Sequence, residues 1–573
     1  MKKKTILLPL LVLTATTLSS CGFSKLFFET KLNTLRVNHY ELYDIDSSKT
    51  YTLDEVKNST VDVKFLPSEE YLPLISLESY AKLIPLMDGY GYKIQSSLTS
   101  DVLTIGAKGM DGNISEPYFV AQFDLTKKNV HVAGATSSIL KISQSYDDLV
   151  KGLDYEAAVI KGENIETYSY SDFNINIYLN GGIEYYPLYF LDMVFSDAVG
   201  INVFYDFDSV YTYDSDSSLS NFKYDNNGTT CSFTTKMKKV VSTRLGGMMP
   251  SYLKEHTREL YMFMMENMYG LKKTRKISSM VNYYKEKGLY NSFTSNDPST
   301  RGKAISNAIN KMDDDHSGVT SYVLSDVWGE AVDSTRGETS IARKNNLKTL
   351  TDSRNEVYTS SGLTLDDVRY SSDGKMAVVV FDSFMGDDVT KFGNKLESIK
   401  NHGGVEKVVV DISTNGGGII ALLFKALSLI SKDTKFETYM WNDASNSTYK
   451  YYGRYDFNDD KKYDTNDCYG DDFEIYLLCS DSSFSCGNAF PCYAKQFGMA
   501  KIIGKRSGGG ECTVTKHMLP NLFGIQHSSN THIGYYSRNT EDFYGFEGGA
   551  TSDIEFGFED FYNIETLYEK INN

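Results

Sequence analysis

The chain has 573 residues with 58 basic and 75 acidic side chains, which gives a formal net charge of −17. This acidic balance argues against nucleic acid as a partner, because nucleic-acid binding requires clustered Lys and Arg. It also argues against adhesion of the protein surface to anionic lipid. The length is sufficient for about three or four domains.

The N-terminus has the features of a bacterial lipoprotein signal. Lysines at positions 2–4 precede a short apolar run, Ile6 to Leu13, and Leu18-Ser-Ser-Cys21 is similar to a lipobox. The apolar run is too short for a stable transmembrane span. We therefore expect a signal peptide over residues 1–20, a lipid on the Cys21 thiol, and a mature chain anchored by that lipid on the extracytoplasmic face of a cell membrane. A plain secretion signal is the alternative.

Residues 21–50 show little patterning and are predicted to be a tether, after which one pattern occurs twice. Glu70-Tyr-Leu-Pro73 in the first copy corresponds to Glu184-Tyr-Tyr-Pro187 in the second. Each copy predicts an alternating strand, a turn and an amphipathic helix. We expect two small α+β repeats, over residues 51–145 and 160–245. They either contact the cell wall or another protein, or only space the rest of the chain from the membrane.

The middle of the chain is predicted to be helical. Residues 250–315 form this segment, in which Leu260, Met262 and Met265 belong to an apolar set at helical spacing. A methionine-rich stripe of this kind is more often core than a ligand groove. Residues 316–370 are interpreted as a linking region.

The C-terminal part, residues 371–565, alternates buried strands with helices, which predicts an α/β domain with a mainly parallel or mixed sheet. Strands are expected at 376–383, 406–412, 474–479 and around 499–503, and helices at 388–400, 419–431 and 487–497. In open sheets of this kind the functional site forms at the carboxyl ends of the strands.

Three separate segments carry residue types that serine hydrolases use. Ser485 follows a predicted strand and precedes a predicted helix, an order that exposes a hydroxyl and aims N–H groups at developing negative charge. Asn415-Gly-Gly-Gly418 also follows a strand, and glycines there let the backbone approach a ligand. His316 follows three acids, a setting that suits a general base. Each segment alone also has an ordinary interpretation: a helix cap, a tight turn and a surface acidic loop.

Taken together, these segments resemble one family, the tail-specific or C-terminal processing serine peptidases, which includes the tricorn protease core. The elements that carry the resemblance occur in the family's order: Lys375 to Phe384, Asp411 to Gly418, Ser483 to Asn488, Ile502 to Gly510 and Gly549 to Ile554. The resemblance implies a ClpP/crotonase-like catalytic domain that cleaves a peptide or protein substrate without a metal or another cofactor. The carboxylate-binding loop of a PDZ domain is not visible in residues 316–370.

Members of this family use either a lysine or a histidine as the base. The Gly-Lys-Gly segment that carries the lysine reads Gly509-Gly510-Glu511 here, so the lysine is absent, whereas Asp314-Asp-His316-Ser317 matches the histidine plan. The resemblance therefore implies Ser485 as nucleophile, His316 as general base and Glu547 as the carboxylate that orients the imidazole. Two nearby acids, Glu541 and Asp542, are alternatives for the third role.

The expected oxyanion donors are the backbone N–H of Cys486 and the N–H of Gly417 or a neighbour. Three positions depart from the family pattern: Ser413, Gly416 and Asn488 stand where Arg, Pro and Glu are frequent. None of the three is a proposed catalytic group, so the departures bear on substrate preference and efficiency.

Six cysteines follow Cys21, and their spacing does not match a metal site. We therefore expect no metal site and mostly free thiols, with a disulfide that involves Cys468 as the alternative. The Cys486 thiol is an alternative nucleophile, but it would need an activating base of its own.

The sequence thus predicts a membrane-anchored extracytoplasmic serine endopeptidase that forms an acyl-enzyme on Ser485. The alternative is a non-catalytic surface lipoprotein that binds peptides or other ligands with the same scaffold.

Overall fold

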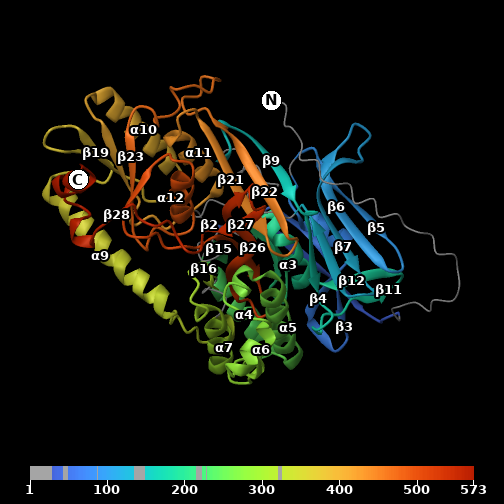
Figure 1. Ribbon diagram of the computed structural model, residues 1–573. Coiled ribbons are helices and arrows are strands. Elements are labelled where there is room, and N and C mark those ends of the chain that lie inside the picture. The colour runs from blue at the N-terminus through green and yellow to red at the C-terminus, as the bar shows by residue number, and fades with distance from the viewer. Residues whose placement is uncertain are drawn as a thin grey trace.

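The computed structural model describes residues 29–572, apart from 43–49, 54, 87, 135–148, 215–221, 227–228 and 321–325. Figure 1 shows the N-terminal sheets (blue) on one side of the molecule and a C-terminal parallel sheet with its helices on the other. The helices of residues 233–310 (green) lie below and between them. The multidomain α/β class predicted from the sequence is confirmed.

The C-terminal sheet is parallel except at one edge. Its strand order is β18 (Arg369–Tyr370), β19 (Met376–Val380), β20 (Lys407–Asp411), β23 (Glu474–Cys479), β24 (Lys501–Gly504) and β28 (Ile554–Glu555), with only β18 antiparallel to its neighbour. The register places Val380, Asp411 and Leu478 side by side at the carboxyl ends. The glycine segment and the Ser485 turn both leave the sheet at this edge.

Helices cover both faces of this sheet, so every residue of β19 is buried. Ala377 and Val379 pack toward α10 (Asp388–His402), α11 (Ile420–Ile430) and α12 (Cys486–Gln496). Met376 and Val378 pack on the opposite face, toward α9 (Glu338–Ser360) and α13 (Ile564–Asn572). A sheet that is covered on both faces has nearly continuous apolar strands, and each fully buried Val or Met side chain contributes about 1.5–3 kcal/mol to stability.

A second sheet joins distant parts of the chain. Its strands are β17 (Gly318–Val319), β26 (Gly524–Ser537), β21 (Lys435–Asn442), β22 (Ser447–Tyr455) and β9 (Leu153–Lys161) in that order, with β25 (Cys512–Met518) and β27 (Asp542–Gly545) also paired to β26. The sequence did not predict this sheet. Its longest strand, β26, contains the run His527-Ser-Ser-Asn-Thr-His532, which is polar yet buried and shows no apolar alternation.

Strands from both N-terminal repeats lie in one sheet, a pairing that the sequence did not predict. Its order is β11 (Tyr178–Asn180), β12 (Ile183–Pro187), β4 (Glu69–Ile75), β3 (Asn58–Leu66), β1 (Asn33–Leu42), β14 (Val210–Asp214) and β13 (Ile201–Tyr205). The repeated motif forms β4 and β12, and these strands pair directly through Tyr186 with Ile75. This pairing satisfies backbone N–H and C=O groups that the edge strand of either copy would expose if the copy stood alone. Strand β1 lies within residues 21–50, so part of the expected tether belongs to this sheet.

Smaller sheets and helices complete the N-terminal and middle parts. The remaining strands are β10 (Ile165–Ser169), β8 (Asn129–Ala133), β7 (Ile114–Asp124), β6 (Ser100–Lys108) and β5 (Tyr90–Ser96) in one sheet, and β16 (Thr229–Ser232), β15 (Lys223–Asn226) and β2 (Thr50–Tyr51) in another. The remaining helices are α1 (Leu77–Leu83), α3 (Leu188–Val199), α4 (Phe233–Leu245), α5 (Ser251–Met268), α6 (Met280–Glu286) and α7 (Pro298–Asn310). Met262 and Met265 of α5 are fully buried in the core.

The expected linking region, residues 316–370, consists mainly of α9 in its described part. Helix α9 packs on one face of the parallel sheet through Leu350. Among the described residues, none of the helices combines the length and the apolarity needed to cross a bilayer. Cys21 and the predicted signal peptide lie outside the described residues.

Candidate active site

Ser485 occupies a strained turn between β23 and α12. Its backbone has φ 57° and ψ −124°, and helix α12 begins at the next residue. A non-glycine residue in a sparsely populated backbone region costs on the order of 1–3 kcal/mol and needs support from its surroundings. The support includes a hydrogen bond from the Ser485 N–H to the Gly509 carbonyl at 3.0 Å. The turn leaves the Ser485 side chain partly exposed at the start of a helix.

The glycine segment lies directly against this turn. A Cβ atom on Gly417 would lie 2.7 Å from Ser485 Cβ and 2.9 Å from the Cys486 nitrogen, so no larger residue fits. Its φ of 99° also favours glycine. The Phe484 N–H donates to the Asn415 carbonyl at 3.0 Å, which joins the two segments. The structure thus brings together the two motifs that the sequence placed at strand ends.

The backbone hydrogen bonds show which of the expected oxyanion donors are free. Within the described residues, the Cys486 N–H has no partner, as the prediction requires. The Gly417 N–H instead donates to the Asn415 side-chain oxygen at 2.9 Å. In this conformation Gly417 is therefore not a free donor. The N–H groups of its neighbours, Gly416 and Gly418, make no hydrogen bond within the described part of the chain.

His316 lies beside the nucleophile turn. Its ring contacts the ring of Phe484, the residue before Ser485, at a centroid distance of 4.7 Å. Gln526 on β26 donates to the His316 carbonyl at 2.7 Å, and β17 pairs with the same strand, so the second sheet positions the histidine. No hydrogen bond joins His316 to Ser485 in this state, and the buried His316 Nδ1 has no partner among the described residues. Catalytic hydrogen bonds are often long before substrate binds.

The surroundings of His316 favour the neutral imidazole. Burial lowers the pKa of His316, and the nearby Arg343 guanidinium lowers it further. The carboxylates of Asp314 and Asp315 oppose this shift. A neutral imidazole is the form that accepts a proton from a hydroxyl.

Glu547 is the best placed of the three acids considered for the third role. Glu541 and Asp542 are exposed, whereas Glu547 accepts hydrogen bonds from the N–H groups of Gly510 and Glu511, both at 3.0 Å. Burial raises the pKa of Glu547, and the two N–H donors oppose that shift. No hydrogen bond links Glu547 to His316 in the described structure. The carboxylate is instead tied to the loop whose Gly509 carbonyl holds Ser485.

Arg343 on α9 connects the segments that carry the predicted catalytic residues. Its guanidinium forms an ion pair with Asp315 and donates to the carbonyls of Asp481 at 2.8 Å and Gly508 at 2.6 Å. It also lies 4.5 Å from the centre of the Phe484 ring. One side chain thus links the His316 segment, the Ser485 turn and the following loop. Sequence reasoning missed Arg343 because it lies in the region interpreted as a link.

We expect Arg343→Lys to lower kcat by about 10²-fold, because small displacements of reacting groups have effects of this size. A lysine cannot reproduce the planar fork that serves several acceptors at once. The measurement is steady-state peptide hydrolysis together with thermal unfolding. Lys344→Gln, on the exposed side of the same helix, is the matched control. Equal kcat values for Arg343→Lys and the control would contradict this role.

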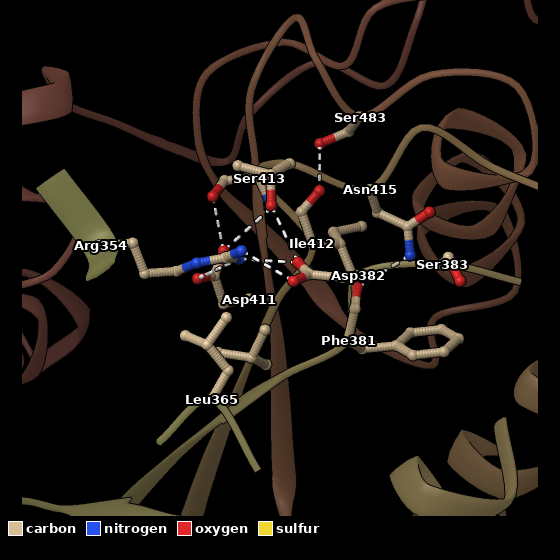
Figure 2. A network of polar contacts seen from close by, with 12 residues as sticks. Arg354, Leu365, Phe381, Asp382, Ser383, Asp411, Ile412, Ser413, Asn415 and Ser483 are labelled. Atoms are coloured by element: carbon tan, nitrogen blue, oxygen red, sulfur yellow. Dashed lines mark hydrogen bonds and ion pairs between the residues drawn. The ribbon is translucent and has the colours of Figure 1, made fainter. Parts of the chain in front are cut away.

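A second arginine of α9 contacts the segments that follow β19 and β20, and Figure 2 shows Arg354 beside Asp411 and Asp382. Arg354 donates two hydrogen bonds to Asp382, each 2.7 Å long, and lies 3.5 Å from the buried carboxylate of Asp411. Ser413 donates to the same Asp411 at 2.6 Å. These contacts fix the carboxyl ends of β19 and β20, from which Asn415 extends. Ser413, which stands where the related family often has Arg, thus shares Asp411 with the Arg354 guanidinium of α9.

The alternative bases and nucleophile lack the necessary surroundings. Burial raises the pKa of the Cys486 thiol to about 12, and its sulfur lies 3.2 Å from the Gly418 carbonyl, so it stays protonated. Lys505, which lies a few residues before the segment where other family members carry the lysine base, pairs with Glu555 on the surface. All six cysteines of the described residues are free thiols, in agreement with the prediction.

Residues 375–556 match the family model described as Peptidase family S41. This part of the chain is an S41 serine peptidase domain. The S41 domain includes Ser485, Gly417 and Glu547, whereas His316 and Arg343 precede the matched residues. The family assignment made from the sequence is therefore confirmed for this part of the chain.

No curated protein matches the chain. Similar solved structures include the photosystem II D1 C-terminal processing protease, at 15% identity over 33% of this chain and 44% of that one, with a TM-score of 0.26. The tricorn protease is 13% identical over 84% of this chain and 47% of its own, with a TM-score of 0.32. A lipoprotein from Streptococcus agalactiae is 14% identical over 57% of this chain and 96% of its own, with a TM-score of 0.35. At these TM-scores the likeness carries no argument about function.

Proposed function

We propose that the protein is a lipid-anchored extracytoplasmic serine endopeptidase that hydrolyses peptide bonds through an acyl-enzyme on Ser485. The observation that supports this most strongly is the contact of the strained Ser485 turn with Gly417, beside the free Cys486 N–H. A strained, partly exposed serine next to an unoccupied donor is the arrangement that acyl transfer requires.

In the proposed reaction, His316 removes the proton from the Ser485 hydroxyl as its oxygen attacks the substrate carbonyl carbon. The carbonyl oxygen becomes an oxyanion, and the Cys486 N–H stabilises it. The imidazolium then gives its proton to the leaving amine as the peptide bond breaks. Water, deprotonated by His316, attacks the acyl-enzyme and releases the second product.

Glu547 is proposed to stabilise the imidazolium of His316. Two backbone donors keep its carboxylate in place, but this carboxylate must approach the unpartnered Nδ1 of His316 when substrate binds. Substrate binding is a common source of such final adjustments.

A non-catalytic peptide-binding protein is the second candidate, and one observation favours it. No hydrogen bond connects Ser485, His316 and Glu547 among the described contacts. The two candidates differ in the fate of an unfolded protein such as casein. The endopeptidase generates new amino termini from casein when the purified full-length chain is added, whereas a binding protein retains casein intact.

The anchor is proposed from the sequence of residues 1–21. We expect metabolic labelling with a clickable fatty acid to modify the wild-type chain and not Cys21→Ala, with the labelled chain in the membrane fraction. The N-terminal sheets would then lie between the membrane and the S41 domain, where they contact the cell wall or another protein or act as a spacer. Label on Cys21→Ala equal to wild type would contradict lipidation at this thiol.

A further inference from the structure

Three metal-ligating side chains converge at a point outside the proposed catalytic residues. Cys512 on β25 and His532 on β26 are direct cross-strand partners, and Glu511 precedes Cys512. The His532 Nδ1 atom lies 2.8 Å from a Glu511 carboxylate oxygen and 3.6 Å from the Cys512 sulfur. All three donor atoms lie within 4.8 Å of one another. These three donor atoms are close enough to one another to bind a single small ion.

The direction of the contacts distinguishes this cluster from a catalytic triad. A thiol–imidazole–carboxylate triad needs the thiol and the carboxylate on opposite ring nitrogens, so that the ring can pass a proton. Here both Cys512 and Glu511 approach the same nitrogen, Nδ1 of His532. The other nitrogen, Nε2, has no partner among the described residues. Among the described residues, the polar contacts of the ring therefore all lie at Nδ1, and the Trp441 ring packs against it at a centroid distance of 5.1 Å.

Burial and charge form a second, independent observation. Glu511, Cys512 and His532 are 6%, 2% and 3% exposed. Asp314 and Glu547 lie near enough to interact electrostatically with the Cys512 thiol. Neither forms an ion pair with Lys or Arg in the part of the chain that the structure describes. Asp314 is buried and Glu547 is half-buried, and their carboxylates accept hydrogen bonds only from uncharged donors among the described residues. A bound cation would compensate this negative charge.

We propose that Glu511, Cys512 and His532 bind one divalent cation of the zinc type. Zinc takes thiolate, imidazole and carboxylate ligands in tetrahedral sites, and three protein ligands leave one position for water. Calcium and magnesium prefer oxygen ligands only, so the sulfur and nitrogen donors select against them. Spacing along the chain gives no sign of this site, because strand pairing brings Cys512 and His532 together.

The bound cation would stabilise the loop beside the S41 active site. The second carboxylate oxygen of Glu511 accepts the Glu547 N–H at 2.8 Å. The adjacent Gly510 packs on the Phe484 ring, next to Ser485. A cation that fixes Glu511 would therefore fix the backbone of Glu547. The ion has a positioning role in this proposal and takes no part in the chemical step.

The test is zinc binding by the purified full-length chain, freed of metal with a chelator and titrated against a chromophoric competitor. We expect one zinc ion per chain, bound about 10²-fold more weakly by Cys512→Ser and by His532→Asn, a loss of the size seen when metal sites are disturbed. Cobalt in place of zinc should give a thiolate-to-metal charge-transfer band in the wild type. Cys468→Ser removes another buried thiol and serves as the matched control.

Absence of stoichiometric zinc binding to the folded wild type would overturn the proposal. Equal zinc affinity in the wild type, Cys512→Ser and His532→Asn would overturn it too. The cobalt band is measured on the unmodified chain, so the test does not depend on how well the variants fold. Metal binding is measured without substrate, so its outcome is independent of the proposed peptidase reaction.

Discussion

Ser485→Ala is expected to abolish peptide-bond hydrolysis while the fold stays intact. Loss of a serine nucleophile costs on the order of 10⁶-fold in kcat in a comparable triad. The Ser485 hydroxyl makes no hydrogen bond among the described contacts, and alanine tolerates the backbone angles as serine does, so the change in unfolding free energy should stay within about 0.5 kcal/mol. The measurement is hydrolysis of a fluorogenic protein substrate, with thermal unfolding alongside.

Lys505→Met is the control for this experiment. Lys505 lies on the surface, paired with Glu555, in the stretch where the related family's alternative base would be sought. We expect the activity of this variant to equal the wild type. Hydrolysis by Ser485→Ala at the wild-type rate would exclude Ser485 as nucleophile, and complete loss in Lys505→Met would indicate a lysine base.

His316→Ala is expected to lower kcat nearly as much as Ser485→Ala, and the double variant should be no worse than either, because triad members act as a unit.

The wild-type pH profile provides a separate check. The imidazole must be neutral to accept the proton, so activity rises with pH through the pKa of His316. Because burial lowers that pKa below its ordinary 6.5, the midpoint should lie below 6.5 and activity should be full at neutral pH.

The measurement is kcat/KM across the acidic range, since this ratio reports the free enzyme. A profile that is flat through the acidic range, or one whose midpoint lies well above 6.5, would contradict His316 as the base. Glu547→Gln offers a matched comparison. It keeps the shape of the side chain and removes the charge that stabilises the imidazolium.

The parallel sheet was predictable because its signals are local. The strand that contains Val408 to Asp411 is a run of β-branched residues, and Asn and glycines follow it. Such a pattern shows in the sequence where the strand begins and where it ends. Strands β19, β20 and β23 and helices α10, α11 and α12 all occur within a few residues of their predicted positions. The proximity of Gly417 to Ser485 was also predictable, because functional sites in open α/β sheets form at the carboxyl ends of the strands.

The second sheet and the α9 contacts depend on pairing between distant residues. Strand β9 pairs with β22 almost three hundred positions later. The sequence pattern of neither strand indicates which strand it pairs with. Helix α9 is largely exposed, so the roles of Arg343 and Arg354 have no apolar signature. The shared sheet of the two repeats was missed for the same reason. A repeat pattern shows that two segments fold alike, not whether they pair with each other.

The central claim is that Ser485 is a nucleophile activated by His316, and reaction with a fluorophosphonate serine probe tests it most directly. The probe needs no knowledge of the natural substrate, because it reports only an activated hydroxyl. We expect covalent labelling of the folded wild-type chain and none of Ser485→Ala or His316→Ala. Wild-type protein that is folded yet unlabelled, or label that persists in Ser485→Ala, would contradict it.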